Sequence, residues 1–129
     1  MNNDGVIDIS RLNNPPDKAE FEVAKFFARQ GKDVVFIPPS AIPNQHRPDI
    51  LMDGVEWEIK CPVGSSKRTI ENAIRTAVRQ SKSLIIDLRN IQLSERICIN
   101  QIEREFNGRK YIKRLYVIRK NSVISYYCR

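Results

Sequence analysis

The sequence predicts a single α/β domain, because short apolar segments typical of strands alternate with longer segments that carry helix-capping residues. The predicted order of helices and strands is α-β-β-β-α-β-α-β-β. No repeat, low-complexity segment or interdomain linker interrupts this order, and 129 residues is the length of one domain. We therefore expect residues 1–16 to form a flexible lead-in and residues 17–129 to form the folded domain.

The first half of the chain predicts one helix followed by three strands. Asp17 follows two prolines and can cap a helix that runs to about Gln30. The three strands that come next are expected at residues 33–38, 49–52 and 55–61.

The second half predicts two more helices and three more strands. Ser65 or Ser66 is expected to cap a helix that continues to about Lys82, and Ser94 is expected to cap another that ends near Gly108. The three strands are expected at residues 84–88, 112–119 and 122–127.

Acidic and basic residues gather on a predicted β-hairpin. The dipeptide Asp53-Gly54 is a strong two-residue turn signal, and it places Asp49 directly opposite Glu58 with Cβ atoms about 5 Å apart. Facing carboxylates repel each other, so they need a compensating cation, which Lys60 on the same face supplies in part. A divalent ion would complete the charge balance, and hard carboxylate oxygens suit Mg²⁺ or Mn²⁺. The alternative is an amphipathic strand with a solvated polar face.

The segment Pro48-Asp49, followed after eight residues by Glu58-Ile59-Lys60, resembles the signature of the PD-(D/E)xK nuclease superfamily. The predicted α-β-β-β-α-β order of residues 17–88 also resembles the core of that superfamily. The resemblance implies a restriction-endonuclease-like mixed sheet flanked by helices, with an extra helix and a C-terminal strand pair. It also implies a metal-dependent endonuclease, in which Asp49 and Glu58 hold Mg²⁺ or Mn²⁺ and Lys60 orients the attacking water or stabilises charge on the phosphate.

Two further residues lie on predicted helices at positions that resemble site positions of the superfamily. Glu20 is centred on the apolar face of the first helix, where an unpaired carboxylate is costly, and the resemblance makes it a further catalytic residue and metal ligand. A glutamate is also favoured at a helix start, and that alternative stays open. Gln80 resembles the glutamine of the RecB-type motif and would position a phosphate or the nucleophilic water, although Leu84 stands where that motif has a tyrosine.

The chain is basic, with a formal net charge of +7, so a nucleic acid is the expected partner. A stripe on the second predicted helix would contact phosphates, although a solvated helix face is the alternative. The stripe contains Arg68, Arg75, Arg79 and Lys82. Further nucleic-acid contacts are expected from His46, Arg47, Lys67 and Thr69, while the lone histidine could also be incidental.

Other classes of protein and site receive little support from the sequence. No run of 18 apolar residues is present, so no membrane span is predicted, and the first 20 residues show no signal peptide. Cys61, Cys98 and Cys128 lack the spacing of a metal site or a disulfide framework and are expected to be reduced. Cys61 alternates to the strand face away from Glu58, which argues against a cysteine nucleophile.

Residues 61–72 and 77–88 resemble the C-terminal toxin domains of CdiA-type and other polymorphic bacterial toxins, and the similarity extends over about residues 17–127. Those domains cleave tRNA in contact-dependent growth inhibition. The resemblance therefore implies a tRNase delivered from a larger secreted protein into the target-cell cytoplasm, with a cognate immunity protein as partner.

Three alternatives stay open. One is a cytoplasmic DNA endonuclease of the restriction or Holliday-junction-resolvase type. Another is a metal-free ribonuclease that uses Lys60, Thr69 and arginines. The last is a non-catalytic nucleic-acid-binding module.

Overall fold

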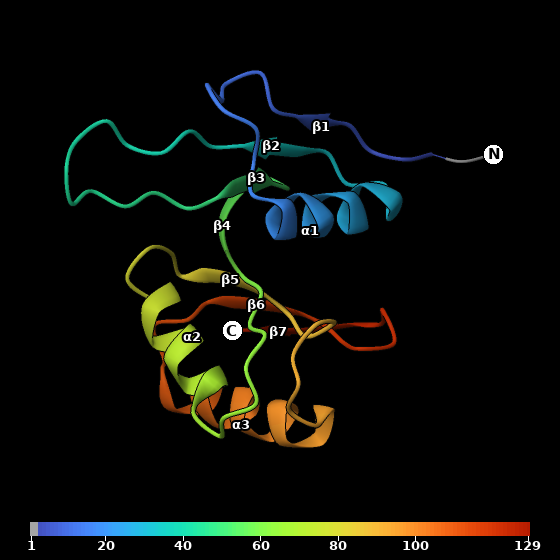
Figure 1. Cartoon of the computed structure of the whole chain (residues 1–129), viewed down its shortest axis with the longest axis vertical. Helices are drawn as coiled ribbons and strands as arrows, with labels where there is room; N and C mark the ends of the chain where they lie inside the picture. The colour runs from blue at the N-terminus through green and yellow to red at the C-terminus, as the bar shows by residue number, and fades with distance from the viewer. Residues whose placement is uncertain (1–2) are drawn as a thin grey trace.

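A computed structural model describes residues 3–129, which form a seven-stranded sheet flanked by helices (Figure 1). The strands follow one another across the sheet in chain order, from β1 to β7. Strand pairs β2–β3, β3–β4 and β6–β7 are antiparallel and the other pairs are parallel, which confirms the expected mixed sheet. The elements are β1 (Ile7–Asp8), α1 (Lys18–Arg29), β2 (Val34–Phe36), β3 (Ile50–Met52), β4 (Val55–Lys60), α2 (Thr69–Ala77), β5 (Ser83–Asp87), α3 (Glu95–Gly108), β6 (Arg114–Ile118) and β7 (Ile124–Cys128).

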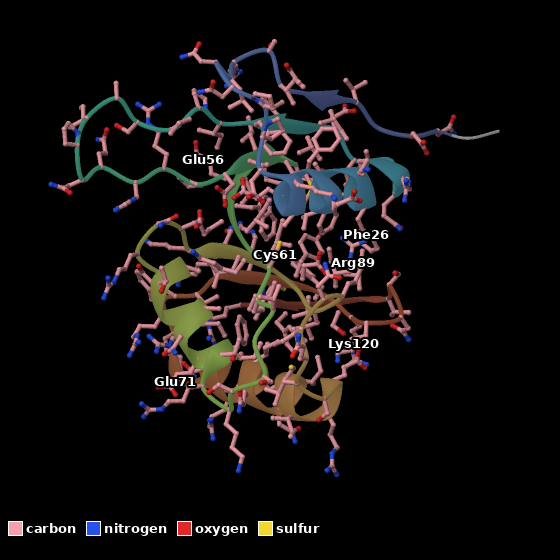
Figure 2. All side chains as sticks on the ribbon, in the orientation of Figure 1. Phe26, Glu56, Cys61, Glu71, Arg89 and Lys120 are labelled. Atoms are coloured by element: carbon pink, nitrogen blue, oxygen red, sulfur yellow. The ribbon has the colours of Figure 1, made fainter. Side chains whose placement is uncertain are left out.

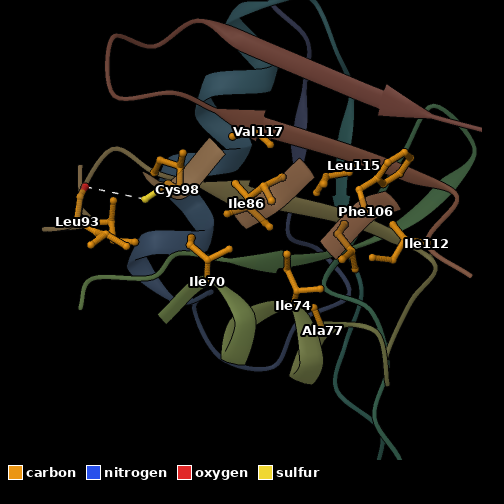
Figure 3. Close-up of a cluster of buried hydrophobic side chains, with 14 residues drawn as sticks. Ile70, Ile74, Ala77, Ile86, Leu93, Cys98, Phe106, Ile112, Leu115 and Val117 are labelled. Carbon is orange, nitrogen blue, oxygen red and sulfur yellow. Dashed lines mark hydrogen bonds between the residues drawn. The ribbon is translucent and has the colours of Figure 1, made fainter. Parts of the chain in front are cut away.

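The sheet separates two apolar layers. On one face, Phe27 of α1 packs in a cluster with Trp57 of β4 and Ile85 of β5. On the other face, α2 and α3 cover β5 and β6, and Ile74 packs in a cluster with Ile86 (Figure 3). Strand β5 is buried along its whole length because its successive side chains point into opposite layers.

The observed order from α1 to β7 confirms the predicted order, and two predicted caps are present. The Asp17 carboxylate accepts hydrogen bonds from the backbone N–H groups of Ala19 and Glu20 at the start of α1. The Ser94 hydroxyl accepts one from the N–H of Ile97 at the start of α3. Both caps satisfy N–H groups that a helix leaves unpaired at its first turn.

The predicted start of the second helix was wrong. Helix α2 begins at Thr69, and its N-cap Arg68 makes no side-chain capping bond. Ser66 instead accepts hydrogen bonds through its hydroxyl from the N–H of Arg68 and through its carbonyl from the N–H of Thr69, each at 3.1 Å. These bonds fold the residues before α2 into a turn. The helix also ends at Ala77, short of the predicted end at about Lys82.

The predicted lead-in at residues 1–16 contains a strand that the sequence did not indicate. β1 pairs in parallel with β2, and the N–H of Val6 donates to the Asp33 carboxylate at 2.8 Å. Residues 1 and 2 of the predicted lead-in lie outside the described residues. None of the helices in residues 3–129 combines the length and the apolar character needed to cross a bilayer.

Candidate catalytic site

The hairpin formed by β3 and β4 has the predicted register. Its turn residues Asp53 and Gly54 have φ values of 56° and 73°, in the left-handed region required by the tight turn that Asp-Gly favours. The backbone partners are Ile50 with Trp57, Leu51 with Glu56, and Met52 with Val55.

Asp49 departs from the predicted register. The N–H of Asp49 donates to the carbonyl of Trp57 at 2.9 Å, and the ladder of paired residues ends at Ile50. The predicted direct cross-strand pairing of Asp49 with Glu58 is therefore replaced by an offset arrangement. The Asp49 carboxylate accepts from the N–H of Ile59 at 2.8 Å, and a hydrogen bond still joins the carboxyl groups of Asp49 and Glu58. The offset thus preserves the contact on which the predicted site depends.

The environment of this pair disfavours two ionised carboxylates. Glu58 is 3% exposed, and burial, the nearby charge of Asp49 and the shared hydrogen bond raise its pKa to about 8. Burial also raises the pKa of Asp49, while the hydrogen bonds from Ile59 and Glu58 act in the opposite direction. The Lys60 Nζ lies 3.5 Å from the Glu58 Oε2 and offsets only part of this effect. The pair accordingly favours a shared proton or an added cation.

Gln80 joins this group from the turn after α2. Its side-chain amide faces Glu58, and the orientation that satisfies both groups has the amide nitrogen donating to both carboxyl oxygens, at 2.7 Å to Oε1. The structure thus brings together four residues that the sequence singled out from three separate segments, namely Asp49, Glu58, Lys60 and Gln80.

Glu20 lies close enough to the pair to share its electrostatic environment. Burial is the main cause that raises its pKa to about 7, and the charges of Asp49 and Asp17 add to the effect while Lys60 opposes it. The structure places Glu20 in the first turn of α1, so its carboxyl group approaches the site from a different element than the hairpin.

A groove of about 410 Å³ runs from Glu20 and Asp49 to the loop between β2 and β3. Glu20 and Asp49 line it, and so do His46 and Arg47, two residues predicted to bind nucleic acid. Figure 1 shows this loop extending away from the sheet. The groove gives a ligand access to Asp49 and Glu20 from the loop side.

The donor set fits a hard divalent cation. Asp49 and Glu58 provide neighbouring carboxyl oxygens with incompletely balanced charge, and carboxyl oxygens together with water are the ligands that Mg²⁺ and Mn²⁺ prefer. Within residues 3–129, no three Asp, Glu, His or Cys side chains are grouped closely enough to hold a metal ion. Glu20 therefore does not complete a three-carboxylate cluster with the other two.

The residues predicted to contact phosphate from the second helix lie apart from the groove. Lys67, Arg68, Arg75, Arg79 and Lys82 are exposed, Thr69 is half-buried, and none of the six lines the groove. Arg75 donates to the Asn72 side chain at 2.9 Å, and the Lys82 ammonium lies 5.9 Å from the centre of the Tyr111 ring. The structure thus divides the predicted nucleic-acid-binding residues into a group on the loop between β2 and β3 and a group on α2 and the segments that flank it.

Sequence reasoning missed the ion pair between Asp87 and Arg89. The guanidinium donates to both Asp87 oxygens at 3.0 and 2.9 Å, and lies 5.2 Å from the centre of the Phe26 ring (Figure 2). It also approaches the backbone carbonyl of Glu22 at 3.5 Å. The pair therefore ties the end of β5 to α1, the helix that carries Glu20. The sequence shows only an acidic and a basic residue two positions apart, which does not indicate this role.

The cysteines in the described residues are free, as predicted. Cys61 packs against the apolar layer that contains Trp57 and Ile59, which confirms the predicted face, although β4 ends one residue earlier, at Lys60. Burial raises the pKa of the Cys61 thiol to about 12, so it stays protonated at neutral pH and is a poor nucleophile.

Comparison with known proteins gives a match to one family and a match to one fold. The family model described as the contact-dependent growth inhibition CdiA C-terminal domain matches residues 46–124. This span contains Asp49, Glu58, Lys60 and Gln80, and it begins after Glu20, which lies outside it.

A solved chain from a "CdiA-CT/CdiI toxin and immunity complex from Burkholderia pseudomallei" matches with a TM-score of 0.67 and 21% sequence identity. The match covers 97% of this chain and 100% of that chain, so the two share a fold. No curated protein matches the sequence.

Proposed function

The chain belongs to the contact-dependent growth inhibition CdiA C-terminal domain family, and we propose that it is a metal-dependent endonuclease toxin of the PD-(D/E)xK type that cleaves tRNA. We also propose that it is delivered as part of a larger secreted protein and acts in the cytoplasm of a target cell. A cognate immunity protein would neutralise it, in keeping with the toxin and immunity complex in which the similar chain was solved.

One observation carries the proposed chemistry: the carboxyl pair of half-buried Asp49 and buried Glu58 is bordered by Lys60 and Gln80. Burying two acidic groups side by side lowers stability, so a fold retains the pair when it performs a function. A basic side chain and an amide next to two hard carboxyl groups are also a set of groups suited to metal-dependent phosphodiester hydrolysis.

The residues around the pair would hold it in place and act on the substrate. Asp49 and Glu58 would hold the ion, which when bound activates water and stabilises charge on the phosphate. The Ile59 N–H orients the Asp49 carboxylate, and the Gln80 amide orients Glu58. Lys60 would position the attacking water or stabilise the phosphate charge. Glu20 would contribute from the groove through a bridging water.

The substrate would reach the site through the groove and be held by basic side chains around it. His46 and Arg47 line the groove with Asp49, so they would contact phosphates next to the cleaved bond. The exposed arginines on and next to α2, Arg68, Arg75 and Arg79, would bind the RNA backbone further away, which adds affinity without sequence choice. The choice of tRNA rests on the resemblance of residues 61–72 and 77–88 to tRNA-cleaving toxin domains.

Purified protein incubated with tRNA and, separately, with duplex DNA tests the proposal. We expect tRNA to be cut in Mg²⁺ and left intact in EDTA. Glu58→Gln should lower the rate by about 100-fold or more, the scale of losing one group that stabilises transition-state charge. Glu56→Gln is the matched control, because Glu56 is an exposed glutamate on the same strand, and its rate should stay within about twofold of wild type.

Each contrary result points to a different conclusion. tRNA cleavage that persists in EDTA would replace the metal mechanism with a metal-free one, and cleavage of duplex DNA alone would replace the substrate. Binding without cleavage would leave a nucleic-acid-binding module. Unchanged cleavage by Asp49→Ala would remove the proposed site.

A further inference from the structure

The turn that carries Gln80 is attached to β4 by a neighbouring side chain. The Ser81 hydroxyl donates to the backbone carbonyl of Glu56 at 2.8 Å and accepts from the N–H of Ser83 at 3.0 Å. Glu56 lies two residues before Glu58 on the same strand. Ser81 therefore links the residue next to Gln80 with the strand segment that carries the carboxyl group Gln80 contacts.

Backbone pairing alone does not provide this link. The parallel ladder between β4 and β5 begins at the pair Glu58 and Leu84, after the turn has ended. At its other end, the turn is held to α2, since the N–H groups of Gln80 and Ser81 both donate to the carbonyl of Ala77 at 2.9 and 3.2 Å. The Ser81 hydroxyl thus supplies the contact with β4 at the point where the ladder has not yet started.

We propose that Ser81 is a positioning residue whose hydroxyl holds the Gln80 amide against the Glu58 carboxyl group. Its effect on cleavage rests on the proposed function, while its effect on the Gln80 amide does not. Without the hydroxyl, the turn would keep its backbone bonds to α2 and, through the carbonyl of Lys82, to the N–H groups of Lys113 and Arg114, but it would lose its side-chain contact with β4. Gln80 would then lose the geometry that lets one amide nitrogen face both oxygens of Glu58.

A matched control separates positioning from the simple loss of a hydrogen bond. The hydroxyl of Thr76 also donates to a backbone carbonyl, that of Asn72, at 2.9 Å, but it lies on the exposed surface of α2. Thr76→Val removes this bond and should leave Gln80 unaffected. Ser81→Thr keeps a hydroxyl and should restore what Ser81→Ala loses.

Nuclear magnetic resonance of the ¹⁵N-labelled, metal-free protein gives a readout that does not depend on activity. The side-chain amide signals of Gln80 are assigned by their disappearance in Gln80→Ala. We expect them to be separated from those of exposed glutamines in wild type, Thr76→Val and Ser81→Thr. In Ser81→Ala they should move to the positions of exposed glutamine amides. Unmoved signals in a folded Ser81→Ala protein would overturn the proposal.

Cleavage kinetics then test whether the two residues act together. Ser81→Ala should lower kcat about 10-fold with little change in KM, as expected when one catalytic group loses its position. In a Gln80→Ala background the same change should alter kcat by less than about twofold, because the group it positions is already gone. If the decreases in kcat from Ser81→Ala and Gln80→Ala multiplied in the double variant, Ser81 would have a structural role separate from Gln80, and the proposal would be overturned. If wild type cleaves no nucleic acid but the amide signals move as expected, the proposed function fails and the positioning role stands.

Discussion

The Glu58 side chain is buried next to Asp49, where water solvates neither carboxyl group fully. The main causes of its raised pKa are burial and the charge of Asp49, and both disfavour the ionised form. The contacts of Glu58 with Lys60 and Gln80 reduce this cost without removing it. At the scale of single residues, the carboxyl groups best suited to catalysis therefore also lower the stability of the fold.

This cost predicts how stability depends on pH in EDTA. The folded-state pKa of Glu58 is about 8 against an ordinary 4.5, so the folded protein retains a proton that the unfolded chain releases. The stability from this group is fully present below about pH 4.5 and is lost as the pH rises to about 8. Glu58→Gln should therefore have a higher Tm than wild type at pH 8, by roughly 4 °C for each kcal/mol gained in the free energy of unfolding. At pH 5 the difference in Tm should be smaller.

Thermal unfolding followed by circular dichroism measures these Tm values. Glu56→Gln is the control, since Glu56 is exposed and its variant should follow the wild-type pH dependence. If plots of Tm against pH were parallel for wild type and Glu58→Gln, burial of Glu58 would not lower stability at high pH.

At this scale, residues near one another in a local motif were predictable, while side-chain contacts between distant segments were not. The turn chemistry of Asp53-Gly54 determines the approximate register of Asp49 and Glu58, so the sequence could predict it. The offset at Asp49 depends on which backbone groups it bonds, and the pattern of residue types does not encode that choice. The contact from Ser81 to β4 depends on how α2 packs, so it appears only in the structure.

At the scale of elements, the hairpin turn should be sensitive to side chains at Gly54. Gly54 has a φ of 73°, and an added Cβ would meet no atom within 4 Å, so any cost of Gly54→Ala comes from backbone conformation alone. We expect a loss of about 1 kcal/mol in the free energy of unfolding. Urea denaturation measures it.

Gly108 provides the comparison for this substitution. An added Cβ there also meets no atom within 4 Å, but Gly108 is the last residue of α3 and does not have a positive φ. Gly108→Ala should be neutral or slightly stabilising, by up to about 1 kcal/mol. Equal losses in the two variants would show that the turn conformation is not the cause.

The basic surface formed by α2 and the turn that follows it predicts a specific change in salt dependence. If Arg79 contacts an RNA phosphate, Arg79→Gln should reduce the slope of log affinity against log salt concentration by about 0.7 to 0.9. Fluorescence anisotropy with labelled tRNA in EDTA measures the slope without cleavage. Arg104→Gln changes an exposed arginine on α3 and should leave the slope unchanged. If both variants kept the wild-type slope, Arg79 would not contact the RNA.

Helices and strands were predictable where their signals are local. Asp17 and Ser94 cap helices through bonds to residues within one turn, so sequence position identified both. β1 is formed by only two residues and exists because β2 pairs with it, so no periodic pattern marks it. Ser66, three residues before the start of α2, forms a turn instead of capping the helix, because it accepts hydrogen bonds from the N–H groups of Arg68 and Thr69.

At the scale of the whole molecule, β5 contributes side chains to both apolar layers. Ile85 points into the layer with α1, and Ile86 points into the layer with α2 and α3. Ile86→Ala should lower the free energy of unfolding by about 2–5 kcal/mol, since it leaves a cavity in a fully buried layer. Because the layers share one sheet, the loss should also affect the distant layer.

Trp57 reports on that coupling, because it is the only tryptophan and lies in the layer opposite Ile86. Its fluorescence and the far-ultraviolet circular dichroism should give the same lowered urea midpoint in Ile86→Ala. A shift in circular dichroism with an unchanged fluorescence transition would mean that the two layers unfold separately.

β4 has an antiparallel neighbour on one side and a parallel neighbour on the other. Its hairpin partner brings Asp49 to Glu58, while the crossover through α2 brings Gln80 to the same residue. One residue inserted into the Asp53-Gly54 turn would slip β3 along β4 and move Asp49 to the other face, yet leave Gln80 in place. An insertion in the crossover would displace Gln80 and spare Asp49. Length variation can therefore alter the two halves of this site independently.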